Sequence, residues 1–311
     1  MTGCANARLY TERLEYRYLM PKFILRSVYT AAVKYLGILV LRAAILLASV
    51  AVYPNSQLQA QEKPIVLVSV LPQAYFVDRI AGGLCTTQVM VTAGDVHSGY
   101  EPTIKQMKSA ATALIYITVG HPDFVFETKW LTRIHEINPS LLVVNGFEGL
   151  ELTPDDPHPW VSPRAIRIMI NNITGALSKT FPRNQEDFRA NSEKILSEVD
   201  TLDREIAEQL SKSASKAFLV FHPTWGYFAR DYGLTQIAIE HEGKEPSVTS
   251  LADVISEARM KKVKTILIQP QFSKQSAETV AEELGATAVE IDPLVYDWFA
   301  STRKLVKALV P

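Results

Sequence analysis

Residues 217–234 read AFLVFHPTWGYFARDYGL, in which an apolar run is followed directly by histidine, proline and an aromatic segment that contains glycine. The run 217–221 predicts a buried strand, which places His222 at the strand's carboxyl end. Open α/β sheets bind their ligands beyond the carboxyl ends of their strands. His222 is therefore a candidate ligand-binding residue. The alternative is a half-buried core histidine that caps the next helix.

Strands and helices alternate on both sides of this stretch. Upstream, the sequence predicts strands at 65–70, 86–91, 114–119 and 141–144, and helices at 73–82, 103–111, 123–138 and 163–177. The last of these helices begins with an N-cap serine, Ser162, and a first-turn proline, Pro163. Downstream, strands at 217–221, 265–269 and 287–291 and the apolar segment 236–240 alternate with helices at 225–232, 250–262, 273–284 and 301–309. This alternation predicts parallel sheets with helical crossovers.

Between the two halves, residues 184–213 contain neither glycine nor proline and carry one apolar stripe. The stripe has a spacing of three to four and consists of Ile195, Val199, Leu202, Ile206 and Leu210. We therefore predict two α/β lobes with parallel sheets, joined by a long rigid backbone helix, with a site in the interlobe cleft. The predicted segments are 1–60 (upstream extension and secretory signal), 61–183 (N-terminal lobe), 184–213 (connecting helix) and 214–311 (C-terminal lobe).

The amino-terminal region differs from the rest. From Met20 it runs from a basic section through an apolar stretch at 43–52 to small polar residues before Ala60. This order is typical of a secretory signal peptide, and cleavage is expected near Ala60. The alternative is a transmembrane anchor over residues 35–52, in which the charge of Arg42 would cost about 2.5–3.5 kcal/mol.

Composition narrows the class of protein. The chain has 311 residues, 47% of them hydrophobic and 21% charged, with a formal net charge of −1. These values are typical of a globular protein, and the lack of a basic cluster argues against nucleic acid as a partner. The cysteines are Cys4 and Cys85, and Cys4 lies in the section expected to be removed. The sequence therefore predicts no internal disulfide and no cysteine-based zinc site.

Three further segments place a potential metal ligand at an element boundary. His97 lies in a glycine-bounded loop, His158 in the run DDPHPWVSP (155–163) and Asp292 in the run EIDPL (290–294). With His222, they offer three imidazoles and one carboxylate, a set that suits Zn²⁺ or another first-row divalent ion. Because the four are far apart in sequence, the fold would have to assemble the site, with two ligands from each lobe.

The remaining histidines give weaker predictions. His121, just after a predicted strand, could support the site from behind the ligands. His135 is expected to be solvated on a helix, and His241 lies in a charged loop that could reach over the cleft.

Several enzyme motifs are missing from the sequence. His135-Glu136 does not continue to a second histidine at the zincin spacing, and no Gly-x-Ser-x-Gly, phosphate-loop or dinucleotide fingerprint occurs. The alternative from another class is a zinc-dependent hydrolase with three protein ligands and one water on the metal. It would need a general base, for which the candidates are Glu127, Glu240 and Glu242.

Four motifs together resemble the zinc/manganese solute-binding proteins of ABC importers, the ZnuA/TroA-like family. They are DPHPWVSP (156–163), FHPTWGYF (221–228), QPQF (269–272) and IDPL (291–294), and YEPT (100–103) adds a further match. The resemblance extends from about Pro64 to the C-terminus. It implies an exported receptor with two α/β lobes, a long backbone helix and one divalent metal between the lobes.

The resemblance also implies the metal ligands. His158 and His222 fall on the second and third histidine positions of the family, and Asp292 on its aspartate. In much of the family the first ligand stands two residues before the tyrosine of the YEP element, which is Ser98 here, so His97 is the nearest histidine and Asp95 the alternative. The His- and acid-rich loop of many zinc-specific members is missing. Gln269 stands where many have glutamate.

The sequence thus predicts a periplasmic metal-binding receptor, not an enzyme. It would capture Zn²⁺, with Mn²⁺ as the alternative, and deliver the ion to the permease of an ABC importer. The histidine-rich ligand set favours zinc, because manganese prefers oxygen ligands. A monomer is expected. Besides the hydrolase, a metal-binding adhesion protein without a transporter remains an alternative.

Overall fold

The computed structural model describes residues 26, 28–30, 32–44, 63–92, 99–213, 215–240, 247–272 and 274–310. The chain divides into two compact units, residues 1–62 and residues 63–311. In the first unit the described residues between 26 and 44 are helical, and the predicted cleavage region near Ala60 lies outside the described residues. Within the part of the chain that the structure describes, no helix combines the length and apolar content needed to cross a bilayer.

The first sheet of the second unit is parallel, with the strand order β2-β1-β3-β4. Its strands are β1 (Ile65–Val70), β2 (Thr86–Val91), β3 (Ile115–Thr118) and β4 (Leu142–Asn145). Helices α2 (Leu71–Ala81), α3 (Ile104–Thr112) and α4 (Val125–Ile137) connect them. All residues of β3, and all of β1 after Ile65, are buried, as expected for central parallel strands.

The second sheet repeats this plan, with the order β6-β5-β7-β8 and parallel pairing throughout. Its strands are β5 (Ala217–Val220), β6 (Thr235–Ala238), β7 (Thr265–Ile268) and β8 (Thr287–Glu290). The helices are α7 (Gly226–Tyr232), α8 (Val248–Met260), α9 (Lys274–Leu284) and α10 (Trp298–Leu309). Helix α10 begins three residues before the predicted start, because the Asp297 side chain caps it by accepting the Ala300 N–H.

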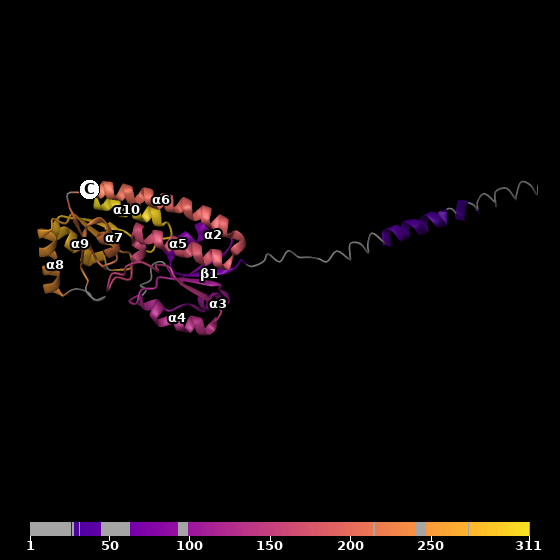
Figure 1. Cartoon of the computed structure of the whole chain (residues 1–311), viewed down its shortest axis with the longest axis horizontal. Helices are drawn as coiled ribbons and strands as arrows, with labels where there is room; N and C mark the ends of the chain where they lie inside the picture. The colour runs from indigo at the N-terminus through magenta and orange to yellow at the C-terminus, as the bar shows by residue number, and fades with distance from the viewer. Residues whose placement is uncertain are drawn as a thin grey trace, which may run out of the picture. The chain divides into compact units, whose positions relative to one another are not determined.

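A long helix, α6 (Gln185–Ser211), joins the two sets of elements and runs above α5 (Pro163–Thr180) and α10 (Figure 1). It spans 27 residues, and the five residues of the predicted apolar stripe are all buried. It packs against α2 and α5 of the first lobe and against α10 of the second. The prediction of two parallel α/β lobes joined by a long helix is therefore confirmed.

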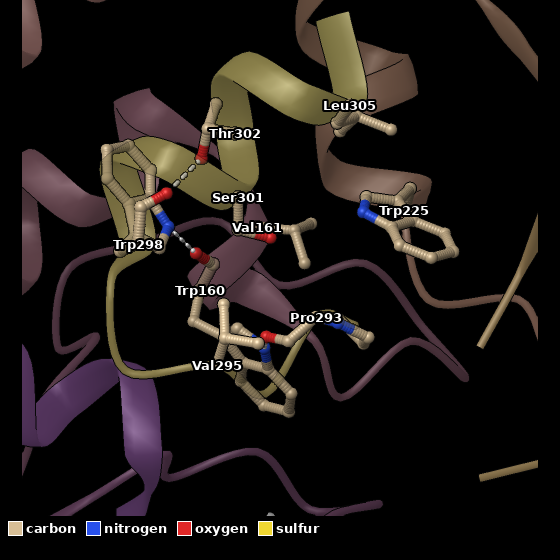
Figure 2. Close-up of a pocket in the computed structure, with 9 residues that line it drawn as sticks. All are labelled: Trp160, Val161, Trp225, Pro293, Val295, Trp298, Ser301, Thr302 and Leu305. Atoms are coloured by element: carbon tan, nitrogen blue, oxygen red, sulfur yellow. Dashed lines mark hydrogen bonds between the residues drawn. The ribbon is translucent and has the colours of Figure 1, made fainter. Parts of the chain in front are cut away.

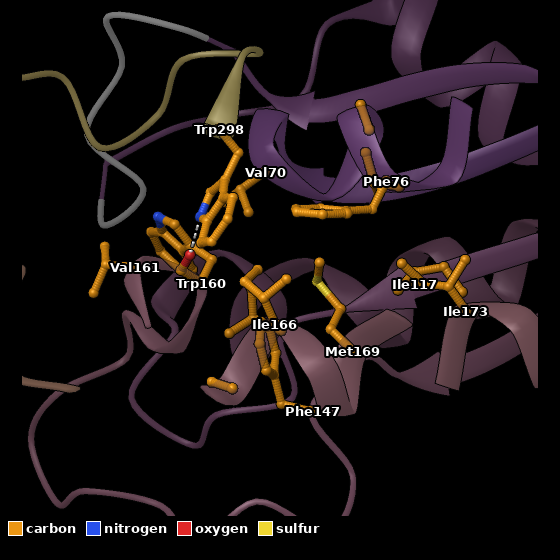
Figure 3. Close-up of a cluster of buried hydrophobic side chains, with 14 of the residues drawn as sticks. Val70, Phe76, Ile117, Phe147, Trp160, Val161, Ile166, Met169, Ile173 and Trp298 are labelled. Carbon is orange, nitrogen blue, oxygen red and sulfur yellow. Dashed lines mark hydrogen bonds between the residues drawn. The ribbon is translucent and has the colours of Figure 1, made fainter. Parts of the chain in front are cut away.

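The hydrophobic core does not stop at the lobe boundary. One cluster of buried side chains includes β1 and α5 together with β5, α7 and α10, while a smaller cluster fills the other face of the second sheet. Figure 3 shows Trp160 and Trp298 beside Val70, Phe76 and Ile166 in the larger cluster. Because both lobes contribute to this cluster, the interface between them is packed like a protein interior.

Candidate metal site

His158 is held by the carboxylate two residues before it. Its ring Nδ1 lies 2.8 Å from Asp156 Oδ1, and its backbone N–H donates to the same oxygen at 3.1 Å. Both residues are buried, at 4% and 7% exposure. Burial, reinforced by nearby His222 and His121, lowers the pKa of His158 well below its ordinary value. The imidazole is therefore neutral at physiological pH, as metal binding requires.

Burial shifts the pKa of the partner carboxyl, Asp156, in the opposite direction. Burial raises the pKa of Asp156 to about 7, and the His158 backbone N–H opposes that shift. With Asp156 ionised, the Nδ1–H of His158 donates to it. The nitrogen that would face a metal is then Nε2.

His222 follows β5, as the sequence predicts, and has a carboxylate partner of its own. Its Nδ1 lies 2.5 Å from Oε1 of Glu240, which is 5% exposed and follows β6, the neighbour of β5. The ring also stacks on Phe272, with a centroid distance of 5.0 Å. The carboxylate on Nδ1 leaves Nε2 as the His222 nitrogen that would bind a ligand, and the side chain is 22% exposed.

Gln269 fixes the turn that carries His222. Its side-chain amide donates to the His222 carbonyl at 2.6 Å and to Thr224 Oγ1 at 3.0 Å, while its oxygen accepts the His222 N–H at 3.3 Å. Gln269 is 1% exposed and lies just after β7. Gln269 therefore fixes the backbone that carries His222, a predicted ligand.

Asp292 lies after β8 and is oriented by two donors. Its Oδ1 accepts from the Gln271 side-chain amide and from the Leu294 backbone N–H, both at 2.9 Å. Gln271 is adjacent in sequence to Phe272, which stacks on His222. Asp292 therefore belongs to the same group of loops as His222.

The fold brings His158 and His222 together from different lobes, with their ring centroids 5.2 Å apart and their planes nearly perpendicular. Among the described residues, no three His, Cys, Asp or Glu side chains are grouped closely enough to hold a metal ion. His97 and Asp95, the alternatives for the first ligand, lie outside the described residues, as do His241 and Glu242. The full set of four ligands thus stays a prediction.

Two tryptophans tie the segment of His158 to the segment of Asp292. Trp160 Nε1 donates to the Pro293 carbonyl at 3.1 Å, and Trp298 Nε1 donates to the Trp160 carbonyl at 2.7 Å. These residues line a small cavity of about 20 Å³, together with Trp225 and Val161 (Figure 2). The loops that carry the two predicted ligands are therefore joined directly, across the lobe boundary.

His121 and Glu127 have structural partners in the first lobe. His121 is buried, with Nε2 3.1 Å from the Thr153 carbonyl and Nδ1 accepting the Asp123 N–H. Glu127 accepts the backbone N–H groups of Val119 and Gly120 at 2.5 and 2.7 Å and a hydrogen bond from Ser69. The carboxylate therefore fixes the loop after β3. His135 is exposed on α4, as predicted.

We expect Glu127 to make stability depend on pH. Burial raises its pKa to about 7 from an ordinary value of 4.5, against the effect of its hydrogen bonds. The folded state therefore holds this proton more tightly than the unfolded state, and the stabilisation is lost as pH rises through 7. A shift of this size corresponds to about 3 kcal/mol. The measurement is urea unfolding of the metal-free protein and of Glu127→Gln between about pH 5 and about pH 8. Relative to the variant, the wild type should lose stability as pH rises, and parallel curves would contradict this assignment.

The two carboxylates that orient the histidines were not predicted from the sequence. The role of Asp156 could have been predicted, because an acidic side chain two residues before a histidine in a proline-flanked loop can accept hydrogen bonds from that histidine's backbone N–H and ring N–H. Glu240 was considered only as a general base, because its contact with His222 depends on β6 pairing with β5. The structure instead directs Glu240 to His222 Nδ1, and Glu127 to the backbone.

Comparison with known proteins agrees with this fold. The structure resembles a solved structure of ZnuA with a TM-score of 0.75 and 32% sequence identity, covering 79% of this chain and 97% of the solved chain. The class of protein is thus one with two α/β lobes, each built on a four-stranded parallel sheet, that a long helix bridges.

The chain belongs to the ZnuA family, described as zinc-uptake complex component A, periplasmic, whose family model matches residues 66–310. Curated relatives include the zinc-binding lipoprotein AdcA of Streptococcus pneumoniae, 27% identical over 260 residues, and the zinc-binding protein AdcA of Streptococcus pyogenes, 27% identical over 266 residues. The matches cover 77% and 76% of this chain. The chain spans about half the length of these curated relatives, 52% in each case.

Proposed function

We propose that this chain is an exported receptor that binds one divalent metal ion between its lobes and delivers it to the permease of an ABC importer. Zinc is the expected ion, with manganese as the alternative. The observation that carries the proposal is the pair of imidazoles, His158 and His222, whose ring centroids are 5.2 Å apart. Membership of the ZnuA family supports the same conclusion.

The donor set supports zinc as the cargo. Each imidazole has a carboxylate on Nδ1, which orients the ring and raises the basicity of Nε2 as a ligand. Histidine nitrogen is a preferred ligand of zinc, whereas manganese favours carboxylate and carbonyl oxygen. Asp292 would supply the carboxylate, and His97 or Asp95 the remaining position.

A metallohydrolase is less well supported. Such an enzyme needs a base close to the metal-bound water. Glu240 is bonded to the far nitrogen of His222, and Glu127 is buried against the backbone of residues 119 and 120. We therefore propose that the site stores and releases the ion without chemistry on a second substrate.

The relatives and the amino-terminal sequence support a cellular setting for this proposal. The matched family is described as periplasmic, and one curated relative is a lipoprotein. The order of basic, apolar and small polar residues before Ala60 supports export by a signal peptide. We propose a periplasmic monomer with an ABC permease as its protein partner, and a lobe assignment of 61–183, 184–213 and 214–311.

The proposal is tested by measuring metal content. The chain from Gln61, which contains the whole compact unit 63–311, would be stripped with a chelator and titrated with Zn²⁺ and Mn²⁺. We expect one tightly held zinc per chain, preferred over manganese in competition. Failure of both ions to bind at micromolar concentration would overturn the proposal. A preference for manganese would support the receptor assignment but make manganese the cargo.

A further inference from the structure

A glycine of the second lobe lies against the carboxylate that orients His158. Gly226 is the first residue of α7, four residues after His222 in the sequence. A Cβ atom on Gly226 would lie 2.2 Å from Asp156 Oδ2 and 3.3 Å from Asp156 Cγ. Side chains do not approach so closely, so any residue other than glycine would displace the carboxylate.

The backbone of Gly226 does not itself require glycine. Gly226 is not among the described glycines with a positive φ, and it is the first residue of a helix, where other residues are also accommodated. The next atom that a Cβ at this position would meet is Gln236 Nε2, at an ordinary contact distance of 3.8 Å. Among the described residues, the severe conflict is therefore with Asp156 alone.

Asp156 has little freedom to yield. Its Oδ1 is engaged by both N–H groups of His158, the Tyr227 backbone N–H also acts on the carboxylate, and the side chain is buried. Moving the carboxylate away from Gly226 would change the geometry of the bond to the His158 ring. A residue of one lobe would thereby alter the orientation of an imidazole of the other.

We propose that Gly226 is a positioning residue for metal binding: its missing side chain provides the space in which Asp156 holds the His158 ring with Nε2 toward the metal. The inference rests on the proposed function, because it assigns His158 as a ligand. It adds a residue that touches neither the metal nor the imidazole. It also gives the Gly in the HPTWG run a role distinct from that of the neighbouring His222.

The test compares Gly226→Ala with Gly175→Ala. Gly175 lies inside α5, and a Cβ atom added to it would have no other atom within 4 Å, so it is a matched control for glycine-to-alanine replacement in a helix. We expect zinc affinity to fall about 10- to 100-fold in Gly226→Ala and to stay unchanged in Gly175→Ala.

A second readout needs no metal. In ¹⁵N-histidine NMR of the metal-free protein, the Nδ1–H signal of His158 should shift or disappear in Gly226→Ala, whereas that of His222, bonded to Glu240, should stay in place. Unchanged His158 signals would overturn the inference, whatever happens to affinity. If the wild type bound no zinc, the proposed function would fail while this comparison still decided the role of Gly226.

A double-mutant cycle removes the ambiguity of misfolding. In an Asp156→Ala background the conflicting carboxylate is gone, so Gly226→Ala should have no further effect on zinc affinity or on the His158 signals. The double variant should also fold as Asp156→Ala does, even if Gly226→Ala alone does not fold. An equal effect of Gly226→Ala in both backgrounds would show that the glycine acts through something other than Asp156.

Discussion

Replacing His222 with alanine is expected to lower zinc affinity by about two orders of magnitude. Structural zinc in zinc-finger peptides is bound with about 10–16 kcal/mol, and on that scale one ligand of four accounts for roughly 3 kcal/mol. The substitution also removes the partner of Glu240, whose Oε1 lies 2.5 Å from His222 Nδ1 and which is only 5% exposed. Isothermal titration with a competing chelator would measure the loss.

Two companion variants separate binding from folding. His222→Asn retains an amide donor for Glu240 but lacks the Nε2 position, so it should fold like the wild type and still bind zinc weakly. His135→Ala removes an exposed histidine from α4 and should leave affinity unchanged. Wild-type affinity in both His222 variants would remove this residue from the site and contradict the ligand set.

The largest effect on stability is expected for Trp298→Ala. Trp298 is 3% exposed, packs against Phe76 and Phe299, and donates to the Trp160 carbonyl. Loss of a buried tryptophan typically costs about 3–5 kcal/mol, because the surrounding side chains only partly fill the space. Trp298→Phe, which keeps a ring but leaves the Trp160 carbonyl unpaired, should cost about 1–3 kcal/mol.

Urea unfolding of the metal-free protein measures both effects. Met260→Ala is the control, since Met260 is 75% exposed and its removal should change stability by less than about 0.5 kcal/mol. Trp298→Phe should also weaken zinc binding, because the tie between the His158 and Asp292 segments is cut. Wild-type stability of Trp298→Ala would contradict the packing of the lobe interface described above.

Much of the fold could be predicted because its signals are local. The apolar stripe from Ile195 to Leu210 repeats at helical spacing, so α6 and its buried face follow from the sequence. The N-cap at Ser162 likewise depends on neighbouring residues, and its side chain accepts the Ala165 N–H as predicted. The position of His222 after β5 follows from the apolar run that precedes it.

The contacts across the fold could not be predicted in the same way. Glu240 meets His222 only because the sheet order places β6 beside β5, and strand order leaves no local pattern in the sequence. The hydrogen bonds that Trp160 and Trp298 donate reach acceptors 133 and 138 positions away in the sequence. The close approach of Gly226 to Asp156 likewise requires the docked lobes.

The cavity between the lobes gives the protein an intrinsic optical probe. Three of the chain's four tryptophans, Trp160, Trp225 and Trp298, line that cavity, and Trp160 and Trp225 stand two and three residues after the candidate ligands His158 and His222. Indole emission depends on the polarity and the charge around the ring. Arrival of a doubly charged ion beside these side chains would therefore change the fluorescence of the unlabelled chain, and cargo loading could be followed in real time without a dye.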